Sequence, residues 1–108
     1  MYLLGGNTMP PDQLGHAQLA PLLHSEFMVV DDPRSPVSVT LIEVSDRVVT
    51  PHQESYSLVF LGPGDHLLPQ GIHKIVSPKI GELDIFLVPI GLDQAGYRYE
   101  AVFNRLIS

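Results

Sequence analysis

The stretch from Gly62 to Lys74, GPGDHLLPQGIHK, carries two histidines and an aspartate among two prolines and three glycines. Imidazole and carboxylate groups bind zinc and other transition metals, and they also act as general acids and bases. Glycine and proline, by contrast, favour tight turns. The stretch is therefore either part of a metal site or a turn that leads into a strand, and the spacing of its residues favours one of the two.

One metal-binding motif of cupins has glycine, five residues, proline, one residue, glycine, two residues and then histidine. Here four residues separate Gly64 from Pro69, and one residue separates Gly71 from His73. Both spacings are one residue too short. A shift of one residue in a strand turns a side chain to the opposite face of the sheet, so His73 would point away from a metal in that position.

The other cupin motif has two histidines that flank one residue, followed by a glutamate, on an earlier strand. Only His52 and Glu54 stand there, although a metal site with catalytic use generally needs three well-placed protein ligands. The metal hypothesis would rest on His52, Glu54, His66 and His73. We favour the turn interpretation, in which Pro63 and Gly64 shape the turn and His66 is solvated, and keep the cupin-like metal site as an alternative.

Other catalytic arrangements receive less support. The chain has no cysteine, which excludes disulfides, thiolate zinc sites and cysteine nucleophiles, and no serine lies in a Gly-x-Ser-x-Gly sequence. Carboxylate pairs occur at Asp31 and Asp32 and at Glu82 and Asp84. Charged residues in a turn or beside a strand end usually keep the surface soluble. The sequence therefore predicts no enzyme, no catalytic, cofactor-binding or metal residue, and no cofactor.

Composition limits the class of protein and its partners. The chain has 108 residues, of which 44% are hydrophobic and 17% charged, and its net charge is −6. Phosphate backbones and anionic lipids would be repelled, and the six basic residues are spread along the chain, so nucleic acid is not expected as a partner. No apolar run approaches the roughly 20 residues of a membrane helix, and no basic residue precedes the first leucines. We expect a cytoplasmic protein without a membrane association.

One short helix is predicted near the start, between Gln13 and His24, where Leu19, Leu22 and Leu23 share one face. Asp12 is a candidate cap, and Pro21 would interrupt the hydrogen bonds of the helix, which is therefore short or kinked. Residues 1–12 are expected to form a flexible tail, and residues 13–108 a single domain.

The rest of the chain is typical of an all-β domain, because prolines and glycines separate short apolar runs. The predicted strands cover residues 27–30, 36–44, 56–61, 72–76, 83–88 and 97–104. In the second strand the apolar alternation changes phase between Leu41 and Ile42, which indicates a bulge or a sharp bend. This layout predicts a small antiparallel open β-barrel of five to six strands, similar in arrangement to Sm-like and SH3-like barrels, although the two Sm signature pairs are missing.

The strand at 83–88 is apolar on both faces, because Leu83, Ile85 and Leu87 alternate with Phe86 and Val88. Both faces should therefore be covered, either by the N-terminal helix or by a neighbouring subunit.

Three segments, SYSLVFLGP, LPQGIHKIVSPKIGELDIFLVPIG and GYRYEAVFN, together with APLLHSEF upstream, resemble a small bacterial family known only as a domain of unknown function. The likeness covers about residues 19 to 104, and His24 departs from it, since the family more often has glycine there. The resemblance implies a shared fold and no catalytic residues. It supports the turn interpretation of the stretch at 62–74.

Three functional hypotheses follow from these patterns. The leading one is a non-enzymatic interaction or assembly module that forms a homo-oligomer and could also bind another protein. The first alternative is an Sm-like protein that binds single-stranded RNA, and it rests on the layout of the strands. The second alternative is the cupin-like metal-binding protein.

Overall fold

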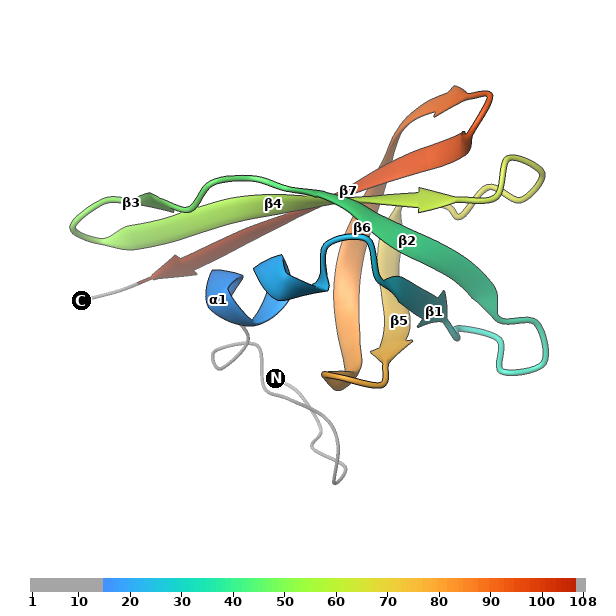
Figure 1. Ribbon diagram of the computed structural model, residues 1–108, viewed down its shortest axis with the longest axis horizontal. Helices are drawn as coiled ribbons and strands as arrows, with labels where there is room; N and C mark the ends of the chain where they lie inside the picture. The colour runs from blue at the N-terminus through green and yellow to red at the C-terminus, as the bar shows by residue number, and fades with distance from the viewer. Residues whose placement is uncertain (1–14, 107–108) are drawn as a thin grey trace.

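The computed structural model describes residues 15–106. Its elements, in chain order, are α1 (His16–Leu19), the 3-10 turn η1 (Ala20–Leu22), β1 (Glu26–Val29), β2 (Val37–Val44), β3 (Val48–Val49), β4 (Gln53–Gly62), β5 (Gly71–Ser77), β6 (Gly81–Asp93) and β7 (Gly96–Leu106) (Figure 1). The predicted fold class is confirmed: six strands form an antiparallel barrel with one short helix at its N-terminal side, and β3 lies outside the barrel. The two-residue strand β3 was not predicted.

The barrel closes because β2 pairs with two different neighbours. The strand order is β2-β1-β5-β6-β7-β4-β3, and β2 also pairs with β4. Leu41 lies opposite Phe60, but Glu43 lies opposite Val59, so Ile42 is an extra residue in the ladder. The bulge that the phase change predicted is therefore confirmed at this position. A bulge increases the local bend of a strand, and here it marks where β2 turns from β1 toward β4.

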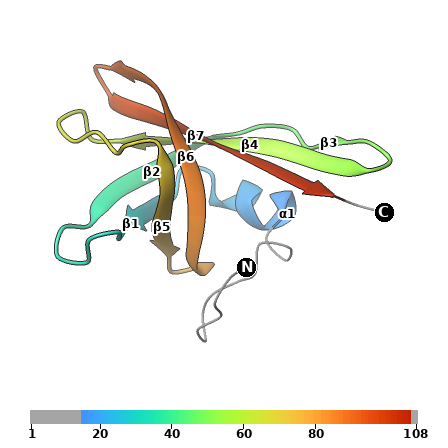
Figure 2. The same ribbon diagram turned by 180° about the vertical axis from the view of Figure 1, so that it is seen from behind.

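Strands β6 and β7 run together at one end and separate at the other (Figure 2). They pair from Asp93 and Gly96 at the hairpin as far as Val88 and Glu100. Beyond that point β6 continues alone with β5, and β7 continues alone with β4. We call the point of separation, at Val88 and Glu100, the fork.

The predicted strand at 83–88 was too short, because β6 continues through Pro89 to Asp93. Proline cannot donate a backbone hydrogen bond, and in sheets it is found at edges and bulges. Here the register shifts directly after Pro89, so that Gly91 is the next residue to pair. Ser77 pairs with Gly81, so the segment SPKIG forms the turn of a hairpin between β5 and β6.

The core lies inside the barrel, where the inward side chains of the strands meet the N-terminal helix. The largest fully buried side chains are Tyr99, Phe27, Phe60, Leu19, Leu41, Leu58, Ile75, Leu83, Leu87 and Val39. The helical segment is shorter than the predicted span, and Pro21 lies in η1, where a helical hydrogen bond from its nitrogen is not needed. Asp12 and the predicted tail at 1–12 lie outside the described residues.

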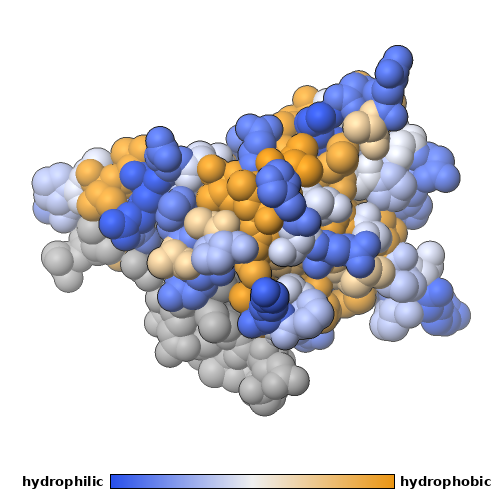
Figure 3. All heavy atoms as spheres, in the orientation of Figure 1, coloured by the Kyte–Doolittle hydropathy of each residue, from blue (hydrophilic) through white to orange (hydrophobic). Residues whose placement is uncertain are grey.

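The helix does not cover the outer face of β6. The His16 ring contacts the ring of Tyr56, 5.3 Å away, and Leu19 and Leu22 belong to the core, so α1 and η1 lie on the inner side of the sheet. Phe86 on the outer side remains 51% exposed. The prediction that the helix covers this face is wrong, and coverage by a second subunit stays a prediction. On the face seen in Figure 3, apolar side chains gather over the middle of the molecule, with a smaller group toward the β3 end.

Candidate functional site

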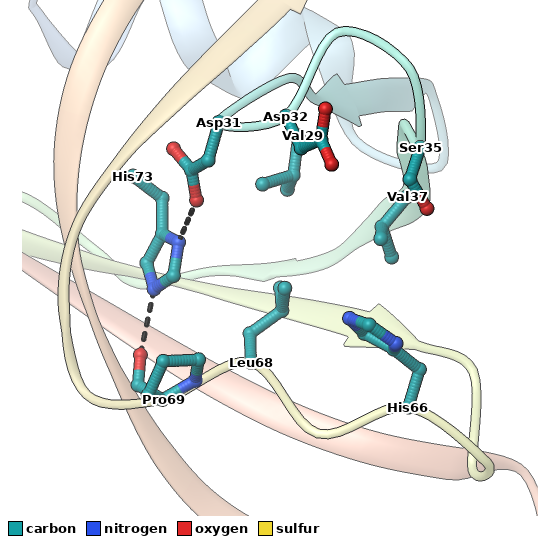
Figure 4. A pocket seen from close by; sticks show the side chains of 9 residues that line it. All are labelled: Val29, Asp31, Asp32, Ser35, Val37, His66, Leu68, Pro69 and His73. Atoms are coloured by element: carbon teal, nitrogen blue, oxygen red, sulfur yellow. Dashed lines mark hydrogen bonds and ion pairs between the residues drawn. The ribbon is translucent and has the colours of Figure 1, made fainter.

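Two loops at one end of the barrel enclose a pocket of about 230 Å³ (Figure 4). One loop joins β1 to β2, and the other is the histidine-containing connection from β4 to β5. The lining residues are Val29, Asp31, Asp32, Ser35, Val37, His66, Leu68, Pro69 and His73. The volume is smaller than the roughly 300–1,000 Å³ that is typical of pockets for drug-sized ligands. The pocket could therefore admit only a small group.

His73 is the buried polar side chain at this pocket, and only 4% of it is exposed. Its Nδ1 lies 2.5 Å from Oδ2 of Asp31, and its Nε2 lies 2.6 Å from the carbonyl oxygen of Pro69 (Figure 4). Both ring nitrogens therefore face hydrogen-bond acceptors of the protein itself. His73 therefore joins two loops to β5 and is not placed as a base.

Asp31 is equally engaged. Its Oδ1 accepts a hydrogen bond of 2.7 Å from the backbone N–H of Lys74, while Oδ2 faces His73. The N–H of Val30 also donates to the carbonyl of Lys74. Asp31 thus extends the contact between β1 and β5 beyond Val29, the last residue of β1 that pairs with β5. Asp32 accepts a hydrogen bond from the N–H of Arg34 inside the turn, so the first carboxylate pair shapes the loop.

A second anchor holds the β4–β5 loop. The hydroxyl of buried Tyr99 accepts a hydrogen bond of 2.9 Å from the N–H of Leu68, whose side chain is buried below the pocket. Burial raises the pKa of Tyr99, and the hydrogen bond from Leu68 lowers it in part. The phenol therefore stays protonated and can also donate to the carbonyl of His66. Hydrogen bonds thus fix the loop within 62–74 at its centre, through Leu68, and near its end, through Pro69.

The structure does not bring the four proposed metal ligands together. His66 and His73 line the same pocket, but the exposed ring of His66 lies toward Ser35 and Val37, away from His73 (Figure 4). His52 and Glu54 lie at the opposite end of the molecule, in the turn after β3 and at the start of β4 (Figure 1). Buried Glu54 accepts a hydrogen bond of 2.9 Å from Arg47. Within residues 15–106, no group of three or more histidines and acids is arranged to hold a metal ion.

The second carboxylate pair lies on the outer face of β6. Glu82 accepts a hydrogen bond of 3.2 Å from the ammonium of Lys74, and Asp84 lies opposite Lys74 in the strand register. The bond to Glu82 and the nearby negative charges raise the pKa of Lys74. This is a surface ion pair between neighbouring strands and does not face the pocket.

Most of the basic side chains are paired with acids. Four ion pairs join Arg34 to Asp32, Arg47 to Glu54, Lys74 to Glu82, and Arg98 to Asp93. These four cations lie on four different parts of the barrel. Folding therefore does not gather them into the basic groove that binding to a phosphate backbone requires.

Sequence reasoning considered Asp31 and His73 separately and missed that they form a pair. The alternation of β5 did carry one signal, because it places His73 on the same inward face as Ile75. No pattern connected His73 to Asp31, which is 42 positions earlier. The anchoring role of Tyr99 was also missed.

No helix in the described part of the chain is long and apolar enough to cross a membrane. No curated protein and no solved structure matches the chain. The model of a family described as a domain of unknown function, DUF6916, matches residues 14–103. This match covers the helix and nearly all of the barrel, and it confirms the resemblance found in the sequence. The chain belongs to the DUF6916 family.

Proposed function

We propose that this protein is a non-enzymatic interaction module that acts in the cytoplasm and assembles with copies of itself. The observation that carries the proposal is a set of exposed, large apolar side chains on the outer faces of the strands, two of them opposite each other on β5 and β6 near the fork and two along the part of β7 beyond it. This set, the fork surface, consists of Ile72, Phe86, Val102 and Leu106, which are 70%, 51%, 59% and 85% exposed.

The fork surface has the character of a contact surface. Ile72 and Phe86 lie directly opposite each other in the register of β5 and β6, so their side chains are neighbours on the outer face. Fully burying a side chain of this kind stabilises an assembly by about 1.5–3 kcal/mol. Grouped exposed apolar residues mark interaction surfaces, whereas single ones are common.

The chemistry of the pocket supports the non-enzymatic part of the proposal. Its buried histidine and the neighbouring carboxylate of Asp31 are both engaged with structural partners. Binding of single-stranded RNA, the first alternative, has less support, because the acidic chain pairs most of its cations internally.

Light scattering coupled to size exclusion tests the proposal directly. The full chain has a mass of 11.9 kDa, and we expect a mass that rises to at least twice this value with concentration. A constant mass of one chain over the whole accessible concentration range would contradict the proposal. Substituting Phe86→Glu should shift the wild-type curve toward the monomer, since it places a charge on the fork surface.

A further inference from the structure

We propose that two copies of this chain join by antiparallel pairing of their β7 strands, with a two-fold axis that passes beside Asn104. This inference rests on the proposed self-assembly and names the segment that performs it. The paired segment lies in the part of β7 beyond the fork and runs from Val102 to Leu106.

This part of β7 has one free edge. On one side, each of its residues pairs with β4, from Ala101 opposite Leu58 to Leu106 opposite Gln53. On the other side, pairing with β6 ends at Glu100. On the side away from β4, both views show the short helix α1 and no described strand (Figures 1 and 2). An unpaired strand edge presents a row of backbone N–H and C=O groups that can bind another strand.

The side chains on this segment fit a second copy of the same segment. Val102, Asn104 and Leu106 all point to the outer face, since they lie opposite Ser57, Ser55 and Gln53 on β4. In an antiparallel pair centred on Asn104, each Val102 lies opposite Leu106 of the other copy, and the two Asn104 side chains lie opposite each other. On this outer face, apolar groups then meet apolar groups, and amide meets amide. The side chains at 102 and 106, both largely exposed in the single chain, cover one another.

Charge distinguishes this edge from the other free edges. The protein carries a net charge of −6, so two copies repel unless they meet where acids are few. The sequence AVFNRL at 101–106 contains no acid and no proline. The free part of β6, GELDIFL at 81–87, contains two acids, and β3 is only two residues long. Of these edges, only the β7 edge is both free of acids and longer than two residues.

A charge-exchange experiment on the full chain tests the register. Asn104→Glu and Asn104→Lys each place two like charges directly opposite each other across the axis. Because like charges in contact at an interface are strongly unfavourable, each variant alone should weaken the dimer by at least about tenfold in Kd. An equimolar mixture of the two variants should recover dimers, since opposite charges then meet. Sedimentation velocity measures the Kd, and circular dichroism verifies that each variant is folded.

Gln94→Glu and Gln94→Lys are matched controls, because Gln94 is an exposed amide in the β6–β7 turn, at the other end of β7, and both should leave the Kd unchanged. Two results would contradict pairing through β7 and leave self-assembly standing. In the first, the wild type associates but the mixture does not recover dimers. In the second, Phe86→Glu disrupts the assembly while both Asn104 variants leave it intact. If the wild type is monomeric throughout, the proposed function itself fails.

Discussion

Replacing His73 by alanine should destabilise the barrel strongly, because this side chain holds three segments together. The ring of His73 on β5 is bonded to Asp31 after β1 and to the carbonyl of Pro69 before β5. The substitution removes both bonds, while the Asp31 carboxylate keeps its hydrogen bond from the N–H of Lys74.

The size of the effect follows from the two contacts. A hydrogen bond to a charged group contributes about 1.5–3 kcal/mol to stability, and a bond between neutral groups about 0.5–1.5 kcal/mol. Because the ring is buried and Asp31 is half-exposed, we take about 2 kcal/mol for the carboxylate bond and about 1 kcal/mol for the carbonyl bond. We therefore expect His73→Ala to lower the free energy of unfolding by about 3 kcal/mol, before any loss from the vacated volume.

Urea denaturation followed by circular dichroism at one fixed pH measures this free energy. His66→Ala is a matched control in the same pocket, since its exposed ring carries no such contacts, and it should change stability by less than about 0.5 kcal/mol. Combining His73→Ala with Asp31→Ala should give less than the sum of the two single effects, because the two residues share a bond. A loss below about 1 kcal/mol for His73→Ala, or strict additivity in the double variant, would refute the anchoring role.

Two further predictions concern the hairpin of β6 and β7. Gly96→Ala should reduce the free energy of unfolding by several kcal/mol, because Gly96 has φ +137° and an added Cβ would collide with the carbonyl oxygen of Gly62. Gly91→Ala is the control and should have little effect, since a Cβ there would meet nothing within 4 Å. The same urea denaturation measures both variants. The hydrogen bond from the N–H of Ala95 and the charge of Arg98 lower the pKa of Asp93 below its ordinary value of 3.8. The ionised carboxylate therefore holds the hairpin turn at pH 3.8, and its stabilising effect is lost as the pH falls through the lowered pKa. The Ala95 amide signal in NMR spectra should follow this acid transition in the wild type and lose it in Asp93→Asn; an unchanged titration in the variant contradicts the assignment.

Much of the fold could be predicted because its strands carry strong local patterns. The alternation of Tyr97, Tyr99, Ala101 and Phe103 faithfully reports the inward face of β7, and the phase change at Leu41 marks the bulge of β2. The patterns failed where the register of pairing with the neighbouring strand decides the outcome. Pro89 is tolerated inside β6 because the register shifts beside it. Strand β3 forms because Val48 and Val49 pair with Ser55 and Glu54 across a turn.

The pocket could be predicted less well than the strands. The turn character of the stretch at 62–74 was evident from its glycines and prolines, and the off-by-one spacing argued against a cupin-like interpretation. The partners of that loop, however, come from the end of β1 and from the middle of β7. Contacts across 31 and 42 positions depend on the closure of the barrel, and no local spacing in the chain encodes them.

The mass of the full wild-type chain in solution, measured by light scattering across a wide range of concentrations, tests the central claim most directly. Self-assembly through the outer surface at the fork predicts a mass that increases from one chain to two or more as the concentration rises. A single-chain mass at every concentration would contradict it.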